Sequence, residues 1–197
     1  MNTKTFGLFP GSFKPPHKGH FNAIKEAALS IDGWLFVIIS PKSRIDSVSE
    51  QPSTLEDALA VWEIYQEHLP KNVQIITAKH SPVTTVYQTI LRLNDKTAVV
   101  EDSVELITEQ IRSNSKQTAI VFASDDDLER FGRLKSTPQI SIVVNPVEAF
   151  NFGDVKISSS NLRHLIATKH THEVLKFMPE ELSLKQRKQV LKIWHIN

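Results

Sequence analysis

The sequence predicts an α/β fold with a doubly wound parallel sheet. Short apolar segments of strand length alternate along the chain with longer segments whose apolar residues recur at helical spacing. This alternation is typical of parallel strands joined by helical crossovers. The continuous apolar segment 34–39 has the composition of a strand buried on both faces. The 197 residues suit one such domain, which we expect over residues 1–168, with a C-terminal helical extension, 169–197, packed on it.

The elements can be predicted in order from periodicity and turn residues. We expect strands over residues 5–9, 34–39, 73–77, 118–123 and 140–144. We expect helices over residues 21–29, 53–68, 83–93, 103–111, 161–167 and 184–194. The helix at 53–68 begins with a predicted capping box, in which Ser53 is the N-cap and Glu56 follows three residues later.

The connecting segments are less regular. Segment 97–101 is predicted as either a short strand or an irregular crossover, and segments 45–52 and 151–154 as loops. Ser124 and the three aspartates after it are predicted to open a further helix, because acidic residues favour a first turn.

Composition and charge exclude several classes of protein. The 23 basic and 22 acidic residues give a net charge of +1, without the block of like charge that typifies a nucleic-acid-binding tail. There is no cysteine, which excludes disulfides and thiolate chemistry. No apolar segment has the length needed to cross a bilayer, and the first residues lack the pattern of a signal peptide. We therefore expect a cytoplasmic protein without nucleic-acid or membrane partners.

The loop over residues 9–20 is the first candidate for function, because it joins a predicted strand to a helix N-terminus. Ligands in doubly wound sheets bind outside the carboxyl ends of the strands, where the strand order reverses. Gly11 and Ser12 would offer backbone N–H groups to a phosphate there. His17 and His20 are three residues apart, which places both rings on one side of a helix, with Gly19 between them. The pair suits a phosphate better than a metal, because no third ligand is fixed nearby.

Two motifs resemble those of a known family. Gly11-Ser12-Phe13 followed by His17-Lys18-Gly19-His20 resembles the HxGH signature of the nucleotidylyltransferase superfamily, and residues 157–163, Ile-Ser-Ser-Ser-Asn-Leu-Arg, resemble its ISSTxxR signature. The resemblance spans residues 5 to about 165. The first motif is similar to that of nicotinamide-nucleotide adenylyltransferases, and the tail at 177–181 to that of phosphopantetheine adenylyltransferases.

The resemblance implies a Rossmann-like nucleotidylyltransferase fold and an activity. The expected reaction transfers AMP from ATP to a phosphorylated acceptor of the nicotinamide mononucleotide or phosphopantetheine type, with release of pyrophosphate. Mg²⁺ is expected to be held mainly by the triphosphate, without protein metal ligands. Homo-oligomers are common in the family.

The resemblance also implies roles for individual residues, transferred by matching positions. His17 and His20 would contact the triphosphate and the transition state, and Lys42 or Arg44 would meet the acceptor phosphate or the reacting centre. The nucleotide-binding residues would be Phe9, Gly11, Ser12, Phe13, Gly19, Ser124, Asp125, Ile157, Ser158, Ser159, Ser160 and Arg163, the last reaching the β- or γ-phosphate.

The sequence departs from the family pattern at several positions. Lys14 stands where many members have Asp or Asn, and Ser160 where Thr is commoner. The Arg-Gly-x-Arg segment of phosphopantetheine adenylyltransferases is missing, which puts that acceptor in doubt. Segments 46–54 and 101–116 are long relative to compact members and leave acceptor recognition open.

Other interpretations remain open. One alternative function is a CTP-dependent cytidylyltransferase acting on a polyol or amino-alcohol phosphate, and another is a non-catalytic nucleotide-binding regulatory module on the same fold. At the level of residues, Ser158–Ser160 could be an ordinary helix cap, and Lys42 and Arg44 could be solvated loop charges. For the aspartates at 125–127, a cap that favours the helix dipole is a better interpretation than a metal site.

Overall fold

The computed structural model describes residues 4–46, 52–111, 116–148, 151–152 and 155–196. The chain divides into two compact units. Unit 1 consists of residues 1–12, 26–41 and 71–148, and unit 2 of residues 13–25, 42–70 and 149–197. The division into residues 1–168 and 169–197 stays a prediction.

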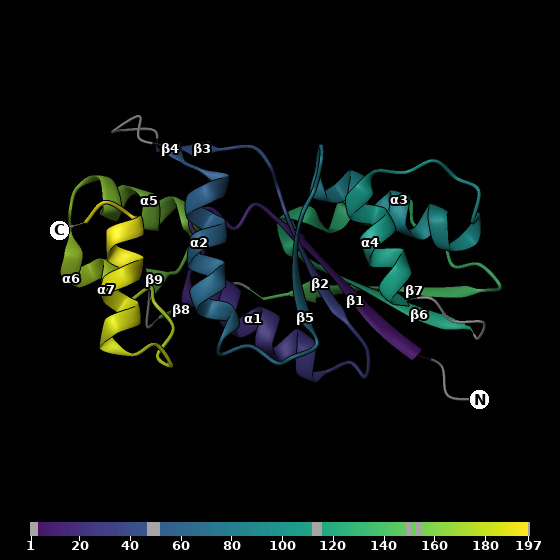
Figure 1. Ribbon diagram of the computed structural model, residues 1–197, viewed down its shortest axis with the longest axis horizontal. Helices are drawn as coiled ribbons and strands as arrows, with labels where there is room; N and C mark the ends of the chain where they lie inside the picture. The colour runs from purple at the N-terminus through teal and green to yellow at the C-terminus, as the bar shows by residue number, and fades with distance from the viewer. Residues whose placement is uncertain (1–3, 47–51, 112–115, 149–150, 153–154, 197) are drawn as a thin grey trace. The chain divides into compact units, whose positions relative to one another are not determined.

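Unit 1 contains a parallel sheet that has five strands among the described residues (Figure 1). The strands are β1 (Lys4–Gly11), β2 (Leu35–Ile39), β5 (Val73–Thr77), β6 (Gln117–Ser124) and β7 (Ile140–Val147). Their order across the sheet is β5-β2-β1-β6-β7. The chain therefore runs from β1 to one edge and then returns to add β6 and β7 on the other side. This order confirms the doubly wound α/β fold and puts its switch point between β1 and β6.

The register shows where β1 and β6 stop pairing. Their pairing runs from Lys4 with Gln117 to Leu8 with Val121. Strand β1 then continues beside β2 as far as Gly11, and β6 continues beside β7 as far as Ser124. Within the described part of the chain, the last three residues of β1 thus pair with β2 and the last three of β6 with β7. Separated strand ends of this kind are where ligands bind in doubly wound sheets.

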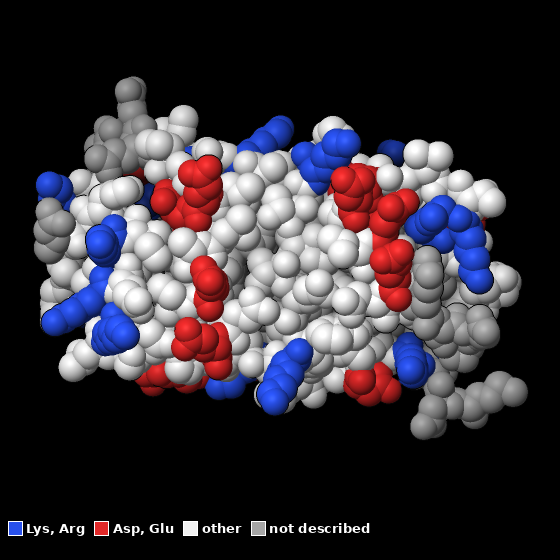
Figure 2. Space-filling model, viewed as in Figure 1, with Lys and Arg blue, Asp and Glu red and all other residues white. Residues whose placement is uncertain are grey.

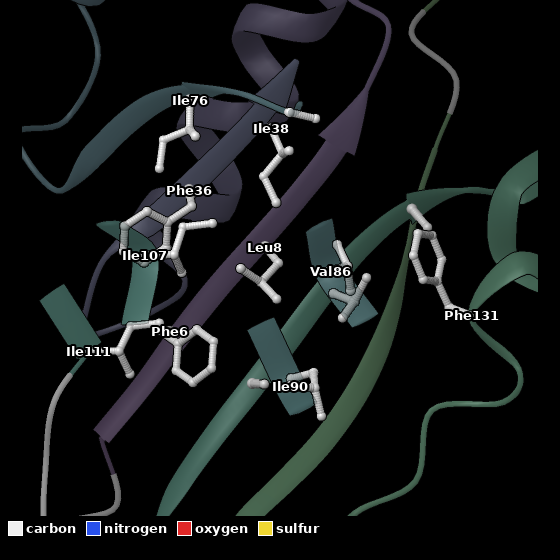
Figure 3. Packing of buried hydrophobic residues seen from close by; sticks show 14 of the residues in the cluster. Phe6, Leu8, Phe36, Ile38, Ile76, Val86, Ile90, Ile107, Ile111 and Phe131 are labelled. Atoms are coloured by element: carbon white, nitrogen blue, oxygen red, sulfur yellow. The ribbon is translucent and has the colours of Figure 1, made fainter. Parts of the chain in front are cut away.

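One face of the sheet is covered by α3 (Pro82–Asn94) and α4 (Asp102–Ile111). Alternate strand residues point to the same face, so Phe6 and Leu8 of β1 project toward these helices. Figure 3 shows them with Phe36 and Ile38 of β2, Val86 and Ile90 of α3, and Ile107 and Ile111 of α4. All of these side chains are buried, so the apolar periodicity of the sequence is what forms this core.

The opposite face of the sheet requires a glycine. A Cβ atom added at Gly7 would lie 2.4 Å from Cδ1 of Leu35 and 3.0 Å from the ring of Phe122. Two residues further along the strand, the ring of Phe9 stacks on Phe122 with 5.7 Å between the centroids. The close approach of neighbouring side chains, rather than backbone conformation, therefore excludes a larger residue at position 7.

Unit 2 is built from helices and two short antiparallel pairs of strands. Its helices are α2 (Leu55–Gln66), α5 (Ser159–Ala167), α6 (Thr171–Leu175), α7 (Leu184–Ile193) and the N-terminal part of α1 (Lys18–Leu29). The strand pairs are β3 (Arg44–Ile45) with β4 (Pro52–Ser53), and β8 (Asn151–Phe152) with β9 (Val155–Lys156). Buried aromatic residues form part of its core, with edge-to-face contacts joining Phe13 to Trp62, Trp62 to Tyr65 and Tyr65 to Phe21. The predicted C-terminal helices are present.

The start of α2 differs from the prediction by one residue. Thr54, not Ser53, is the N-cap, and its hydroxyl accepts the N–H of Asp57 at 3.1 Å. Asp57, not Glu56, completes the capping box by accepting the N–H of Thr54 at 3.4 Å. Ser53 is unavailable because it pairs with Arg44 in the β3–β4 ladder.

Other segments also differ from the prediction. The residues after Ser124 form a 3₁₀ helix, η1 (Asp125–Phe131), where the start of a further helix was predicted. Helix α6 was not predicted, since its five residues are too few to show a periodic pattern. Segment 97–101 is an irregular crossover. The predicted loops 45–52 and 151–154 contribute residues to the two strand pairs, while 47–51 and 153–154 lie outside the described residues.

Charge is mixed on the face shown in Figure 2. Acidic side chains gather over α2 and α4, and basic side chains over α7, whose exposed lysines are Lys185, Lys188 and Lys192. In the residues that the structure describes, no helix combines the length and the hydropathy of a membrane span.

Candidate active site

The loop between β1 and α1 turns at Phe13. Its φ of 53° lies in the left-handed region, which costs a residue other than glycine about 1–2 kcal/mol. Packing holds the turn, because the buried ring of Phe13 makes edge-to-face contacts with the rings of His20 and Trp62, with 5.0 Å and 5.9 Å between the centroids. Aromatic contacts therefore determine the course of the loop where the backbone alone would not.

The two histidines lie against each other. His17 directly precedes α1, where its carbonyl accepts the N–H of Phe21 at 3.0 Å, and His20 is in the first turn. Their rings stack with 3.6 Å between the centroids, so they lie together as their spacing predicts. The backbone N–H of His20 donates to Nδ1 of His17 at 3.4 Å. Because Nδ1 accepts, the proton of neutral His17 is on Nε2, which is then a donor.

Burial makes this pair neutral. It lowers the pKa of His20 to about 3. The pKa of His17 is also well below its ordinary value, first because of burial and second because of the charge that His20 would carry. Both imidazoles therefore supply hydrogen bonds without positive charge near neutral pH. Nδ1 of His20 is buried and has no partner among the described residues.

The backbone N–H groups at the start of α1 are largely occupied. The N–H of Lys18 donates to the carbonyl of Phe177 at 2.7 Å, and those of His20 and Phe21 bond to His17. The helix N-terminus was expected to offer such groups to an anion. These three amides already have partners within the protein.

The second motif begins α5. Ser158 is the N-cap, and its hydroxyl accepts the N–H of Asn161 at 3.2 Å, while Ile157 is buried. This serine therefore has the capping role of the ordinary interpretation. The next two serines, Ser159 and Ser160, instead make hydrogen bonds to other residues.

Ser159 and Arg163 join the two motifs. The Ser159 hydroxyl donates to the carbonyl of Pro15 at 3.1 Å, and NH1 of Arg163 donates to the carbonyl of Lys14 at 2.8 Å. NH2 of Arg163 also donates to the hydroxyl of Ser160 at 2.9 Å. Two segments that are far apart in the sequence are thus held together by hydrogen bonds within unit 2.

The guanidinium group of Arg163 is held by two hydrogen bonds, but not all of its donors have partners among the described residues. Its Nε is buried and has no hydrogen-bond partner within the described part of the chain. Burial lowers its pKa, the nearby charge of Arg44 lowers it further, and Asp46 raises it. Two protein groups, the carbonyl of Lys14 and the hydroxyl of Ser160, therefore fix the plane of the guanidinium group.

Lys42 and Arg44 are exposed on the segment after β2, in unit 2. Two residues close to them, Asp46 and Lys14, were not predicted as site residues from the sequence. Asp46 is buried and acts on Arg163, and Lys14 is buried and donates through Nζ to the carbonyl of Lys42 at 2.8 Å. The alternation of charged residues at 42, 44 and 46 is the signal that could have pointed to Asp46.

The remaining predicted residues belong to unit 1. Gly11 ends β1, Ser12 follows it, and the carbonyl of Gly11 accepts the N–H of Ser40 at 3.0 Å. Ser124 ends β6 and donates to Asp127 at 3.1 Å, and Asp127 also pairs with Arg130 at 3.0 Å.

The predicted site residues are divided between the two units. Unit 1 contains Phe9, Gly11, Ser12, Ser124 and Asp125, and unit 2 contains His17, Gly19, His20, Lys42, Arg44, Arg163, Phe13 and residues 157–160. Among the described residues, no three His, Asp or Glu side chains form a group that could hold a metal ion.

Known proteins resemble this chain in sequence and in fold. It is 28% identical over 89 residues to the "Probable nicotinate-nucleotide adenylyltransferase" of Leptospira interrogans, an alignment covering 44% of this chain and 45% of that protein. A bifunctional NMN adenylyltransferase/ADP ribose pyrophosphatase from Francisella tularensis, solved alone and with AMP and a manganese ion, has a similar fold. The TM-scores are 0.56 and 0.54, the identities 14% and 11%, and each match covers 98% of this chain.

The chain spans about half the length of these relatives, since the two solved chains are covered over 52% and 51% of their residues. A family model has wider coverage here. The cytidylyltransferase-like model matches residues 8–165, a range that includes both motifs and the strands between them. The chain therefore belongs to the cytidylyltransferase-like family of nucleotidylyltransferases.

Proposed function

We propose that this protein is an adenylyltransferase, which transfers AMP from ATP to a phosphorylated acceptor of the nicotinamide mononucleotide or phosphopantetheine type. The observation that carries the proposal is the junction of the two motifs, in which Ser159 and Arg163 donate to the carbonyls of Pro15 and Lys14. The adenylyltransferase relative from Leptospira interrogans supports ATP as the donor.

The reaction needs positioning and charge more than acid–base groups. An oxygen of the acceptor phosphate, which is already ionised, attacks the α-phosphorus of the triphosphate. The bond from that phosphorus to the bridging oxygen breaks, and pyrophosphate leaves with the electron pair. No proton has to be removed from the nucleophile, so cations and N–H donors around the phosphates suffice.

The residues of unit 2 divide this task according to their charge. His17 and His20, neutral near pH 7, would donate N–H groups to the transition state. Lys42, Arg44 and Arg163 would supply positive charge to the acceptor phosphate and the triphosphate. Phe9, Gly11, Ser12, Ser124 and Asp125 of unit 1 remain predictions as nucleotide-binding residues.

Mg²⁺ would accompany the nucleotide. We propose that Mg²⁺ enters as part of the nucleotide substrate, held mainly by phosphate oxygens and water.

The test is the release of pyrophosphate. The protein is incubated with Mg-ATP or Mg-CTP and with nicotinamide mononucleotide, nicotinate mononucleotide, phosphopantetheine, or a polyol or amino-alcohol phosphate. We expect release with ATP and one of the first three acceptors. The matching family model is described as cytidylyltransferase-like, so CTP is tested as the alternative donor. Release of pyrophosphate only with CTP would favour a cytidylyltransferase. Nucleotide binding without release in any combination would favour a regulatory module.

A further inference from the structure

Lys14, which stands where many family members have an acidic residue or its amide, is completely buried. Its exposed fraction is 0% although its side chain ends in an ammonium group. A buried charge is tolerated only where hydrogen bonds compensate for lost water. The Nζ atom donates to the carbonyl of Lys42 at 2.8 Å. Because the side chain is covered, Lys14 can act only through the groups that it holds.

The residue connects three segments of unit 2. Its carbonyl accepts a hydrogen bond from NH1 of Arg163, on α5, at 2.8 Å. Its ammonium group reaches Lys42, the first residue of the segment that carries Arg44. Two guanidinium groups are therefore tied to one residue of the loop, Arg163 directly and Arg44 through the backbone.

The charges around Lys14 favour an anion. Burial lowers the pKa of Lys14 to about 8, and the charge of Arg44 contributes to this shift. Arg44 also lowers the pKa of Arg163, so these cations repel one another. Asp46, which is buried, opposes the repulsion at Arg163. A bound polyanion would relieve it further and would favour the charged form of Lys14.

We propose that Lys14 is a positioning residue that holds the Arg44 segment and Arg163 so that both guanidinium groups bind one triphosphate. The proposal rests on the proposed nucleotidyl transfer and adds a role that a carboxylate at this position could not have, because an ionised carboxylate has no donor for the carbonyl of Lys42. It also implies that the neutral amine form of Lys14 takes up a proton and becomes the ammonium form when the triphosphate binds.

The experiment measures Mg-ATP binding by isothermal titration calorimetry at about pH 8.5, between the pKa of about 8 in the folded protein and the ordinary value of 10.5. Titrations in two buffers with different ionisation enthalpies give the number of protons taken up. The wild-type protein should take up a large fraction of a proton per nucleotide. Lys14→Met should take up none and bind about tenfold or more weakly, the scale of one lost polar interaction.

Two further variants separate positioning from general effects. Lys14→Arg keeps the charge and the donor and should regain part of the affinity. Lys188→Met removes an exposed lysine of α7 and should match the wild type in affinity and proton uptake. If Lys14→Met does not fold, the wild type still decides, because binding without proton uptake would overturn the proposal.

Different results would contradict the proposed function and the proposed role of Lys14. If the wild type binds neither Mg-ATP nor Mg-CTP, the proposed function itself is contradicted. If the wild type binds and Lys14→Met has the same Kd and the same proton uptake, only the role of Lys14 is contradicted. A weaker Kd together with lost uptake in Lys14→Met supports both.

Discussion

Arg163 donates to the backbone carbonyl of Lys14 at 2.8 Å, although 149 residues separate the two in the sequence. This bond joins the two motifs of the family and helps to fix the plane of the guanidinium group, whose buried Nε has no hydrogen-bond partner among the residues that the structure describes. Lysine could not reproduce it, because the planar fork of arginine reaches the carbonyl and the Ser160 hydroxyl together.

Arg163→Ala should therefore weaken binding of the triphosphate. We expect the KM for the nucleotide to rise about 10- to 100-fold, the scale of one lost charge-assisted contact, with a smaller change in kcat. Steady-state kinetics of pyrophosphate release will measure both constants. Arg163→Lys should recover little of the loss, and Lys188→Ala should leave both constants unchanged. An unaltered nucleotide KM in Arg163→Ala would count against the proposed role.

His20→Ala should reduce turnover. His20 is proposed to donate to the transition state, and losing one preorganised donor lowers kcat by about 10² or more. The same assay will measure it, with circular dichroism to check the fold. His172→Ala is the matched control, since that histidine is exposed on α6 and should be dispensable. Turnover equal to that of the wild type in His20→Ala would exclude the assignment.

The neutral histidine pair should make the protein sensitive to acid. The pKa of His20 is about 3 in the folded protein against about 6.5 in the unfolded chain, so between these values the unfolded chain binds more protons. The contribution to the free energy of unfolding is complete above about pH 6.5 and is lost as the pH falls towards 3. The slope is at most about 1.4 kcal/mol per pH unit for one group. His17 has the same sign.

Urea denaturation between these pH values will measure this dependence. His20→Asn removes one titrating group, so its free energy of unfolding should fall less steeply with pH than that of the wild type. His172→Asn should keep the wild-type slope. Parallel curves for wild type and His20→Asn would show that His20 is not held neutral in the folded protein.

The cap of α2 can be located by mutation. Thr54→Ala should lower the free energy of unfolding by about 1 kcal/mol, the usual contribution of an N-cap side chain. Ser53→Ala should change it by less than about 0.5 kcal/mol, because no cap hydrogen bond is lost. Chemical denaturation of the two variants measures the difference. The reverse order would restore the capping box predicted from the sequence.

Gly7 should be intolerant of a side chain. Gly7→Ala places a Cβ atom 2.4 Å from Cδ1 of Leu35, and overpacking of this kind costs about 1–3 kcal/mol. Gly132→Ala is the control, because its φ is −61° and its Cβ would meet only the carbonyl of Glu129 at 3.4 Å. Thermal or urea unfolding of both variants will test this. Equal stabilities would mean that the sheet face adjusts around position 7.

Local signals explain why much of the fold could be predicted. The strand at 73–77 was predicted with the bounds that it has, since Val73, Ile75, Ile76 and Thr77 are β-branched and the polar residues Lys71 and Asn72 precede it. The cap of α2 was misplaced by one residue because Ser53 and Thr54 are both good caps, and pairing of Ser53 with Arg44 decided between them. That pairing depends on two segments folding back on each other, which periodicity does not report.

In the loop of the first motif, too, some properties follow from the local sequence and others from contacts made only on folding. By itself the sequence determined the doubly wound sheet, the family and the side chains available for phosphate chemistry, because apolar periodicity and the two motifs are local properties of the chain. Only the tertiary structure decided that both histidines are neutral, that the amides at the start of α1 are largely occupied and that Lys14 is buried against Lys42 and Arg163. Those properties arise from burial and from partners distant in the sequence, and folding alone brings them together.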